Sequence, residues 1–228
     1  MKLSIKLLLG LLLTFMVLVV INAFSLKSKW EKTDKNNPFL NYQKLSNRSF
    51  KYLKVNAPYQ ATGRVNIGSN EHSELYVSHN WADMVKFKFN NDTLFVDFLR
   101  DSEGKTFSYD NFQKLVIITS PNVNSIETKN ISVEIDSLEQ GQIKLVGKGY
   151  GSFEFRKMNI MDFDIALGGN SSCNFYVPEV QKIASLKAKL ADKSHLNIRA
   201  LMPENIFLEN GLETGLEMNG ATLKLLGK

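Results

Sequence analysis

The sequence predicts an all-β domain preceded by one apolar N-terminal helix. Three observations carry this prediction in the 228-residue chain. Short segments alternate apolar and polar residues, which is typical of half-buried strands. Glycine and asparagine separate these segments and favour tight corners. Part of the chain also repeats itself at intervals of about 22 residues, and repeats of about 20–50 residues are typical of solenoids. We therefore predict a parallel β-helix-like solenoid with an N-terminal hairpin region. A β-sandwich, with strands every ~8–12 residues, remains the alternative.

The first 24 residues contain the apolar segment. Lys2 and Lys6 precede a run, LLLGLLLTFMVLVVI, that begins at Leu7, and the segment ends at Phe24. As a helix, it would reach about 27 Å, close to the ~30 Å hydrocarbon core of a bilayer. It has no polar face, whereas a helix that packs against the core of a soluble protein shows polar residues on one side. Residues 1–24 are therefore predicted to be a signal anchor or a signal peptide.

Two modes of export are compatible with this segment. Cleavage near Ala23 would release the domain. Ile21-Asn22-Ala23 offers alanine at the last position before the cut and a tolerable isoleucine two positions before that alanine, although it is not an Ala-x-Ala site. An uncleaved anchor is favoured by the length of the apolar run. No cysteine follows the run, so a lipoprotein anchor is excluded. We expect a cytoplasmic N-terminus and a domain in the periplasm, although the lysines on the far side, Lys27, Lys29, Lys32 and Lys35, oppose the positive-inside bias.

Residues 25–41 are predicted to be a polar linker, and residues 42–228 the β domain. The linker sequence, SLKSKWEKTDKNNPFLN, shows neither helical nor strand periodicity and contains an Asn-Asn-Pro break. The clearest element of the domain is a hairpin. Its strands, Val85–Phe89 and Leu94–Phe98, alternate in phase and flank the turn residues Asn90-Asn91-Asp92. Leu115–Thr119 is predicted to be a short apolar strand that ends at Ser120-Pro121.

The remaining strands are predicted from short alternating sets. They are Ile131/Val133/Ile135, Ile143/Leu145, Phe153/Phe155, Phe163/Ile165/Leu167, Phe175/Val177, Leu196/Ile198, Ile206/Leu208 and Leu223/Leu225. Val180–Ala191 could be a helix, but Leu186, Ala188 and Leu190 alternate, so we interpret it as a strand. Positive-φ corners are expected at Gly147, Gly149, Gly168-Gly169-Asn170, Asn210-Gly211 and Asn219-Gly220. The repeat aligns the segments that start at Phe163, Leu186 and Leu208.

The layout of residues 48–228 resembles that of the putative auto-transporter adhesin head GIN domain family. The segments that carry the resemblance are Phe50–Val55, Arg64–Gly68, Glu74–Ser78, Val85–Phe89, Asn91–Val96, and Leu115–Thr119 followed by Pro121, Val123 and Ile126. The resemblance implies a right-handed β-helix-like fold in the cell envelope. It also implies a protein without an established enzymatic activity.

Composition and motifs predict no catalytic, cofactor or metal site. Charged residues make up 22% of the chain and the net charge is +5, too small and dispersed an excess for nucleic acid binding. Cys173 is the only cysteine, which excludes an intramolecular disulfide and a cysteine zinc site. The three histidines, His72, His79 and His195, are scattered without metal-ligand spacing. Gly147-Lys-Gly-Tyr-Gly151 lacks the ending of a phosphate-binding loop and is interpreted as a corner.

One pair of carboxylates is a candidate for chemistry. Asp162 and Asp164 alternate with Phe163 and Ile165, so both are expected on one outward strand face. Such a face can hold calcium or acid–base carboxylates, although a solvated face is the more common case.

The leading hypothesis is an exported, membrane-tethered, non-enzymatic envelope module that binds a glycan or protein partner. The alternatives are a carbohydrate-active enzyme that uses Asp162 and Asp164, and a structural spacer or signalling partner at the inner membrane. The membrane is the expected partner of the N-terminal helix, and no oligomeric state is predicted.

Overall fold

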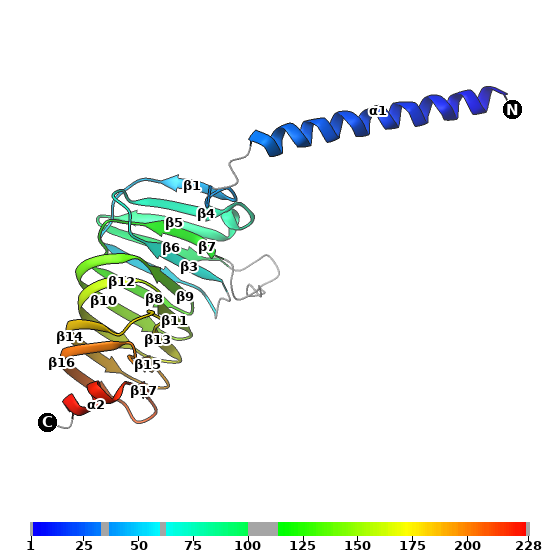
Figure 1. Ribbon diagram of the computed structural model, residues 1–228. Coiled ribbons are helices and arrows are strands. Elements are labelled where there is room, and N and C mark those ends of the chain that lie inside the picture. Colours follow the sequence, from blue (N-terminus) through cyan, green and yellow to red (C-terminus); the bar gives the residue numbers. More distant parts are fainter. Residues whose placement is uncertain (1, 33–36, 60–62, 100–113, 227–228) are drawn as a thin grey trace. The chain divides into compact units, whose positions relative to one another are not determined.

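A computed structural model describes residues 2–32, 37–59, 63–99 and 114–226. The chain divides into two compact units, Met1–Asn41 and Tyr42–Lys228, which are described separately (Figure 1). The first unit contains helix α1, Lys2–Lys32. The second contains the strands, one 3-10 helix, η1 (His79–Met84), and the C-terminal helix α2 (Gly220–Leu226).

Helix α1 is longer than the apolar segment. Its stretch Gly10–Ser28 is long and apolar enough to cross a membrane, as a signal sequence can also be. The prediction that the linker is irregular from Ser25 onward is wrong, because the helix continues to Lys32. Residues 25–32 contain neither proline nor glycine, and Lys27 lies 3.9 Å from Glu31 one turn later. The Asn-Asn-Pro break comes only after these residues.

The second unit is built from two mixed sheets. The nine-stranded sheet has the order β1-β4-β7-β3-β9-β11-β13-β15-β17, and the eight-stranded sheet has the order β16-β14-β12-β10-β8-β2-β6-β5. The nine strands are β1 (Tyr42–Ser46), β3 (Arg64–Gly68), β4 (Glu74–Ser78), β7 (Lys114–Thr119), β9 (Ser132–Asp136), β11 (Gly151–Phe155), β13 (Ser171–Phe175), β15 (His195–Asn197) and β17 (Gly215–Glu217). The eight are β2 (Tyr52–Asn56), β5 (Val85–Asn90), β6 (Thr93–Phe98), β8 (Ser125–Lys129), β10 (Leu138–Lys148), β12 (Met158–Leu167), β14 (Gln181–Leu190) and β16 (Leu201–Asn210).

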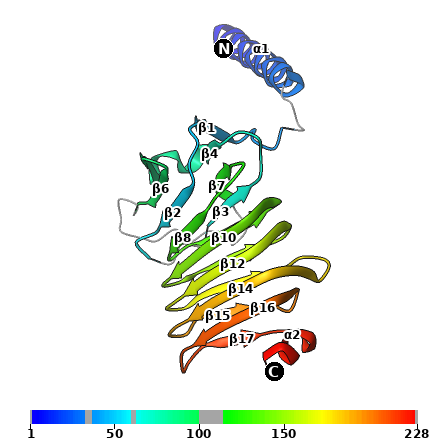
Figure 2. The same ribbon diagram turned by 90° about the vertical axis from the view of Figure 1, so that its left-hand side faces the viewer.

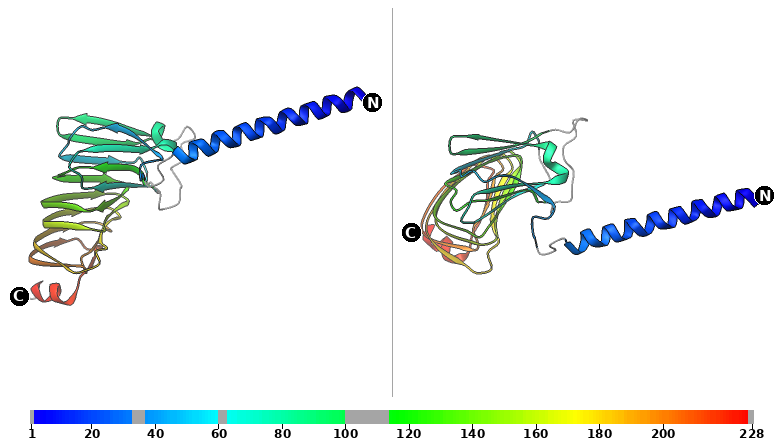
Figure 3. Two further views of the ribbon diagram at one scale, coloured as in Figure 1. Left: turned by 45° about the horizontal axis from the view of Figure 1, so that its top comes forward. Right: turned by 90° about the horizontal axis from the view of Figure 1, so that it is seen from above.

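Most neighbours in the two sheets are parallel, and from β8 onward the chain alternates between the sheets. Successive strands of one sheet therefore align residues about 20 positions apart, a spacing of the kind that repeats produce, as in Leu138 beside Met158. Figures 2 and 3 show these strands lying one above another within the unit. Antiparallel pairs occur only at the N-terminal end of the described sheets, where β1, β4 and β7 pair, and where β5 pairs with β6.

The predicted hairpin and the strand at Val180–Ala191 are confirmed as β5–β6 and β14. The repeat alignment is correct in one step and wrong in the next. Phe163 pairs with Leu186 as expected. Leu186, however, pairs with Ile206 rather than Leu208, a shift of two residues. A two-residue shift keeps every side chain on the same face, so alternation alone does not distinguish the two registers.

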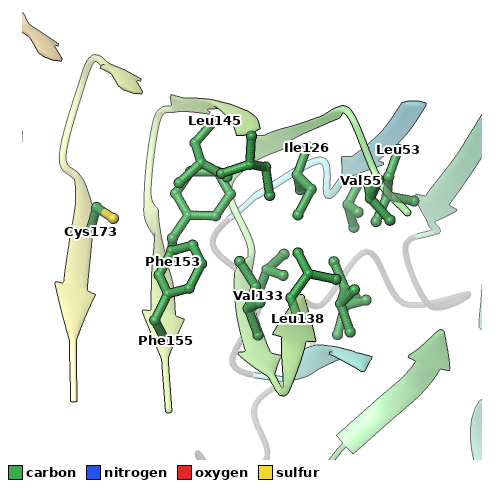
Figure 4. Close-up of a cluster of buried hydrophobic side chains, with 14 of the residues drawn as sticks. Leu53, Val55, Ile126, Val133, Leu138, Leu145, Phe153, Phe155 and Cys173 are labelled. Carbon is green, nitrogen blue, oxygen red and sulfur yellow. The ribbon is translucent and has the colours of Figure 1, made fainter. Parts of the chain in front are cut away.

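The hydrophobic core lies between the sheets and takes alternate residues from both. Figure 4 shows Leu53 and Ile126 of the eight-stranded sheet with Val133 and Phe153 of the nine-stranded sheet in the core cluster. Phe155 and Phe175 stack with ring centroids 4.8 Å apart. Phe163, which comes from the opposite sheet, meets both rings edge-on. These rings therefore join the two sheets as well as neighbouring levels of the stack.

Some corners differ from the sequence prediction. Gly149 and Gly169 have φ of 68° and 71°, as expected, but Gly147, Asn210-Gly211 and Asn219-Gly220 do not have positive φ. Other residues adopt this conformation in the described chain, among them Asn130, Ser137 and Asp192. Asparagine and aspartate tolerate this conformation, and the side chains of Asn130 and Asp192 also accept backbone N–H groups about 20 residues away in the sequence. The Asn130 amide oxygen, for example, accepts the backbone N–H of Tyr150 at 3.0 Å.

The prediction of a strand at Leu223/Leu225 is wrong, because these residues lie in α2. Asn219 caps the helix: its side-chain oxygen accepts the backbone N–H of Thr222 at 2.9 Å. Thr222 is fully buried and its hydroxyl donates to the Leu201 carbonyl oxygen at 3.1 Å. Helix α2 thus closes over the start of β16, where the sequence analysis placed another strand.

Candidate ligand-binding groove

The outward face of the eight-stranded sheet carries two polar rows across β10, β12 and β14. The backbone register places Gln142, Asp162 and Ser185 side by side in the first row. It places Lys144, Asp164 and Lys187 side by side in the second. Because parallel strands in register align equivalent positions, residues about 20 apart in the sequence become neighbours at the ~4.8 Å strand spacing.

These two rows line an open groove of about 400 Å³. Its lining combines Ile143 and Phe163, which are each 2% exposed, with polar side chains. The polar side chains are Asn124, Gln142, Lys144, Asp162, Asp164, Ser185 and Lys187. Asn124 directly precedes β8, so four neighbouring segments of the sheet contribute to the lining.

The charges in the groove balance. Two lysines and two aspartates line it, and the Lys144 ammonium lies 3.5 Å from the Asp164 carboxylate. Both side chains of this pair are about half exposed, at 55% and 47%, so solvent screens the interaction strongly. The groove therefore offers hydrogen-bond donors and acceptors of both charges over the strand backbone, whereas the side chains of Ile143 and Phe163 face the core. This combination suits a ligand rich in hydroxyl or amide groups better than a strongly charged one.

The predicted carboxylate pair lies in this groove. Asp162 and Asp164 are neighbours on the same face of β12, as the alternation predicted. Within the described part of the chain, no group of three or more histidine, cysteine, aspartate or glutamate side chains is arranged to hold a metal ion. Two aspartates beside two lysines can bind and orient a polar ligand, and two carboxylates are also the minimum for acid–base hydrolysis of a glycosidic bond.

The nine-stranded sheet has a polar cluster that the sequence analysis missed. The Arg64 guanidinium bridges Glu134, at 3.0 Å, and Glu154, at 2.7 Å. Asn66 donates to the other oxygen of Glu134 at 3.1 Å, and Arg156 lies 3.3 Å from that residue. Burial raises the pKa of the Glu134 carboxyl, but Asn66, Arg156 and Arg64 outweigh this effect and hold the pKa below its ordinary value.

This cluster joins segments of distant sequence and has the character of a structural network. The side chain of Glu134 is only 9% exposed, so little of the carboxylate is available to a ligand. The only sequence signal is a charged residue between Val133 and Ile135, which looks like any solvated strand position. Its partner Arg64 is 70 residues away in the sequence, and nothing in a single sequence connects the two.

The other candidate residues lie apart from the groove. His72 and His79 flank β4 at exposed positions, and His195 of β15 lies 3.5 Å from Glu217. Cys173 is fully buried, and burial raises the pKa of its thiol far above the ordinary value. The segment Gly147–Gly151 forms the corner between β10 and β11, and Gly149 has the left-handed backbone conformation there.

Solved structures of bacterial proteins resemble this chain. A putative adhesin from Bacteroides fragilis is 14% identical, with a TM-score of 0.50, over 78% of this chain and 96% of the other. A putative lipid binding protein from Parabacteroides distasonis is 11% identical, with a TM-score of 0.32, over 78% and 96%. A putative adhesin from Parabacteroides merdae is 13% identical, with a TM-score of 0.29, over 78% and 95%. At such identities only the first likeness bears on the fold, and none bears on function. Among curated proteins, none matches the chain.

The family is established by sequence. The model of the family described as "Putative auto-transporter adhesin, head GIN domain" matches residues 49–210, which is most of the chain and nearly all of the strands. The matched region contains the groove, the Arg64 cluster and the core that joins the two sheets. The chain therefore belongs to the putative auto-transporter adhesin, head GIN domain family.

Proposed function

We propose that this protein is an exported, membrane-tethered, non-enzymatic module of the cell envelope, which binds a glycan or protein partner in the groove over β10, β12 and β14. The observation that carries the proposal is the groove itself, in which donors and acceptors from three parallel strands stand side by side. Membership of a family of putative adhesins supports a binding role.

The proposed architecture is a right-handed parallel β-helix-like solenoid whose N-terminal end is closed by a hairpin. The regular spacing of about 20 residues between paired strands, and the alternation of the chain between the two sheets, support this architecture. A solenoid suits the proposed function because its stacked strands hold the lining residues in fixed rows. A β-sandwich would present a similar face, so the binding proposal does not depend on this choice.

The proposed tether is helix α1, with the domain on the periplasmic side. Its apolar side chains from Leu11 to Ile21 are exposed within the unit, as expected for a helix that a bilayer surrounds. Intact mass and membrane fractionation of the protein from its full-length gene test this point. Full-length mass in the inner-membrane fraction supports the anchor, whereas a mass that begins near Phe24 in a soluble fraction supports cleavage near Ala23 and release.

Ligand binding is tested with the full-length protein in detergent on an array of neutral and acidic glycans and envelope proteins. The variant Asp162→Ala/Ser185→Ala removes two side chains from one row of the groove. We expect it to weaken binding of any captured ligand about tenfold or more, since each lost hydrogen bond contributes about 0.5–1.5 kcal/mol. Asn159→Ala, on an exposed position of β12 outside the groove, is the matched control and should bind normally. Equal binding by both variants would refute the groove as the site.

A carbohydrate-active enzyme is a second candidate, because both predicted carboxylates line the groove. Alternate residues of a strand are about 6.6 Å apart along the chain, a separation compatible with two carboxylates that flank a glycosidic bond. Asp162→Asn and Asp164→Asn, measured singly on any glycan that the protein binds, distinguish the two functions. Loss of product formation with retained binding would support the enzyme. If the parent protein turns over none of these glycans, the enzyme hypothesis is rejected and the binding function is retained.

A further inference from the structure

The eight-stranded sheet ends in two unlike edges, β5 at one end of the stack and β16 at the other. Helix α2 covers only the start of β16, where Asn219 and Thr222 both donate to the Leu201 carbonyl oxygen. Beyond this point, the described residues Ile206–Asn210 pair with β14 on one side only. Edge strands of this kind are templates for pairing with another chain.

The unpaired backbone groups of both edges can be located from the hydrogen bonds on the paired side. The N–H of Gly211 donates to the Leu190 carbonyl oxygen of β14 at 2.9 Å. In a parallel pair, alternate residues bond to the same neighbour, so the backbone groups of Ile206 and Leu208 point to the open side. Beside β5, the N–H of Leu99, which follows β6, donates to the carbonyl oxygen of Met84, which precedes β5, at 2.9 Å. Bonded and non-bonded pairs alternate in an antiparallel pair, so the backbone groups of Phe87 and Phe89 point to the open side.

The same four residues carry apolar side chains that face the core but are only partly covered. Phe87, Phe89, Ile206 and Leu208 pack against the core cluster as partly buried residues, whereas Leu94 and Leu186 on the adjacent strands are fully buried. Both ends of the core are therefore only partly covered at the two sheet edges, and at the β5 edge the Arg48 guanidinium lies over the Phe89 ring, 5.1 Å from its centroid, where an added strand would replace it. A strand added at either edge would cover these side chains.

The outward side chains of the two edges differ in charge. Strand β5 presents Lys86 and Lys88, both exposed, whereas β16 presents Phe207, which is 66% exposed, and Glu209. Glu209 already has Lys189 of β14 on its inner side at 2.9 Å. The side of Glu209 that faces away from the sheet is open to a second cation.

We propose that a second copy of this chain docks head to tail, with β5 of one copy antiparallel to β16 of the other. Two copies stacked in the same orientation meet in the antiparallel direction, since β5 alone among the eight strands runs against its neighbour. Among the registers that pair the open backbone groups, we choose the one that places Phe87 opposite Leu208 and Phe89 opposite Ile206 on the core face, because it sets a lysine opposite a carboxylate. On the outward face it places Lys86 opposite Glu209 and Lys88 opposite Phe207.

Pairing of two β5 edges is less favourable. A β5 edge pairing with another β5 edge would set lysines of the two copies directly opposite each other, and like charges across strands are destabilising. The unlike pair instead joins a lysine to a carboxylate and covers four half-buried apolar side chains. Because the contact is heterologous and leaves a free edge at both ends, repeated docking yields open chains of subunits rather than a closed dimer.

Disulfide trapping tests the register with the full-length protein in detergent. Lys86→Cys and Glu209→Cys are made in separately tagged chains and mixed under mild oxidation. Positions 86 and 209 would form a pair without mutual backbone bonds, whose Cα atoms lie about 4.5 Å apart, within the reach of a disulfide. Cys173 does not compete because it is fully buried. We expect the mixed cross-link to exceed the links between like chains at least tenfold.

Lys189→Cys is the matched control for Glu209→Cys. Lys189 is the register partner of Glu209 on β14, one strand inward and on the same face. The second strand spacing puts it about 9.5 Å from position 86, which a disulfide does not span. Equal trapping of Lys86→Cys by both partners would overturn the proposed register. Dominant links between identical chains would overturn the head-to-tail contact.

Charge reversal provides a second measurement without cysteines. Sedimentation of the detergent-solubilised protein should show association that rises with concentration, and Lys86→Glu should weaken it about fivefold, since a cross-strand pair contributes roughly 0.2–1 kcal/mol. Adding Glu209→Lys to the same chain restores the opposite-charge pair and should recover the association. A parent protein that stays monomeric at all concentrations, or a double variant no better than the single one, would overturn the proposal.

Discussion

Glu134 has more charged and hydrogen-bonding partners than either aspartate of the groove, and its side chain is also less exposed than theirs. Arg64, Asn66 and Arg156 all contact it, and Lys114 lies 3.9 Å away. By contrast, the ion pair between Lys144 and Asp164 is half exposed. At the residue scale, the most strongly held carboxylate therefore lies on the nine-stranded sheet, whereas the carboxylates of the groove are more exposed.

Glu134→Gln is expected to destabilise the fold by about 1–3 kcal/mol at pH 7, because hydrogen bonds to a charged group are lost in a poorly solvated site. The pKa of Glu134 is held below its ordinary value in the folded state, chiefly by Asn66, Arg156 and Arg64 acting against burial. Its stabilisation is thus complete above the unfolded pKa of about 4.3 and is lost as pH falls through the lower folded pKa.

Urea unfolding of both proteins between pH 7 and pH 3 measures this effect. The difference in free energy between the parent and Glu134→Gln should be constant down to about pH 4.3 and should shrink below it. Glu139→Gln, at an exposed position of β10, is the control and should differ little from the parent at any pH. A difference that grows towards pH 3 would contradict the assignment.

Gly149→Ala is expected to destabilise the protein by about 1–3 kcal/mol, because a left-handed backbone is unfavourable for alanine. Gly149 has φ of 68°, and an added Cβ would lie within 2.1 Å of the Asn130 side-chain oxygen, an oxygen that accepts a backbone bond from Tyr150. Gly141→Ala is the matched control, since nothing lies within 4 Å of a Cβ there. Thermal unfolding compares the two, and equal melting temperatures would refute the argument.

At the scale of single elements, strands were predicted more accurately where the alternation of apolar and polar residues extends over more residues. The β5–β6 hairpin was predicted correctly because two triplets of alternating residues flank turn chemistry at Asn91-Asp92. Leu223 and Leu225 gave only two alternating residues, which a helix accommodates equally well, and they lie in α2. The capping residue Asn219 was read as a corner for the same reason: asparagine favours both structures.

Asn219→Ala is expected to release α2 from β16. The side chain of Asn219 accepts the N–H of Thr222 and donates to the carbonyl oxygens of Arg199 and Leu201, each at 2.9 Å. Loss of an N-cap costs about 0.5–2 kcal/mol. Hydrogen exchange should therefore accelerate about tenfold in residues 220–226 while the core strands β10 and β12 keep their protection. Asn210→Ala, at an exposed position at the opposite end of β16, should leave the exchange unchanged.

At the scale of the whole molecule, the sequence predicted the inward residues well and the lateral neighbours poorly. Asp162 and Asp164 were assigned to one outward face from alternation alone, and both line the groove. That Lys144 and Lys187 flank Asp164 follows from parallel register between distant strands. Register shifts of two residues preserve alternation, as the misplaced Leu208 shows, so a single sequence does not determine which residues share a row.

The strands from β2 to β15 share one continuous core, which bears on how the domain unfolds. The rings of Phe155, Phe163 and Phe175 connect neighbouring levels and both sheets. Stacked repeats can unfold separately when the contacts between neighbours are weak. Contacts of this kind, repeated along the stack, favour one cooperative transition. We therefore expect the N-terminal and C-terminal levels of the described domain to unfold together.

Two probes near opposite ends of the stack test this expectation. Cys173 is fully buried with a raised thiol pKa, so alkylation should be negligible in the folded protein and should report unfolding around β13. Trp81 in η1 reports the other end by fluorescence once Trp30 is replaced by phenylalanine. We expect both urea midpoints to coincide within error. If Cys173 is alkylated at a lower urea concentration than the fluorescence change, the C-terminal levels unfold first. The domain would then not unfold in one cooperative transition.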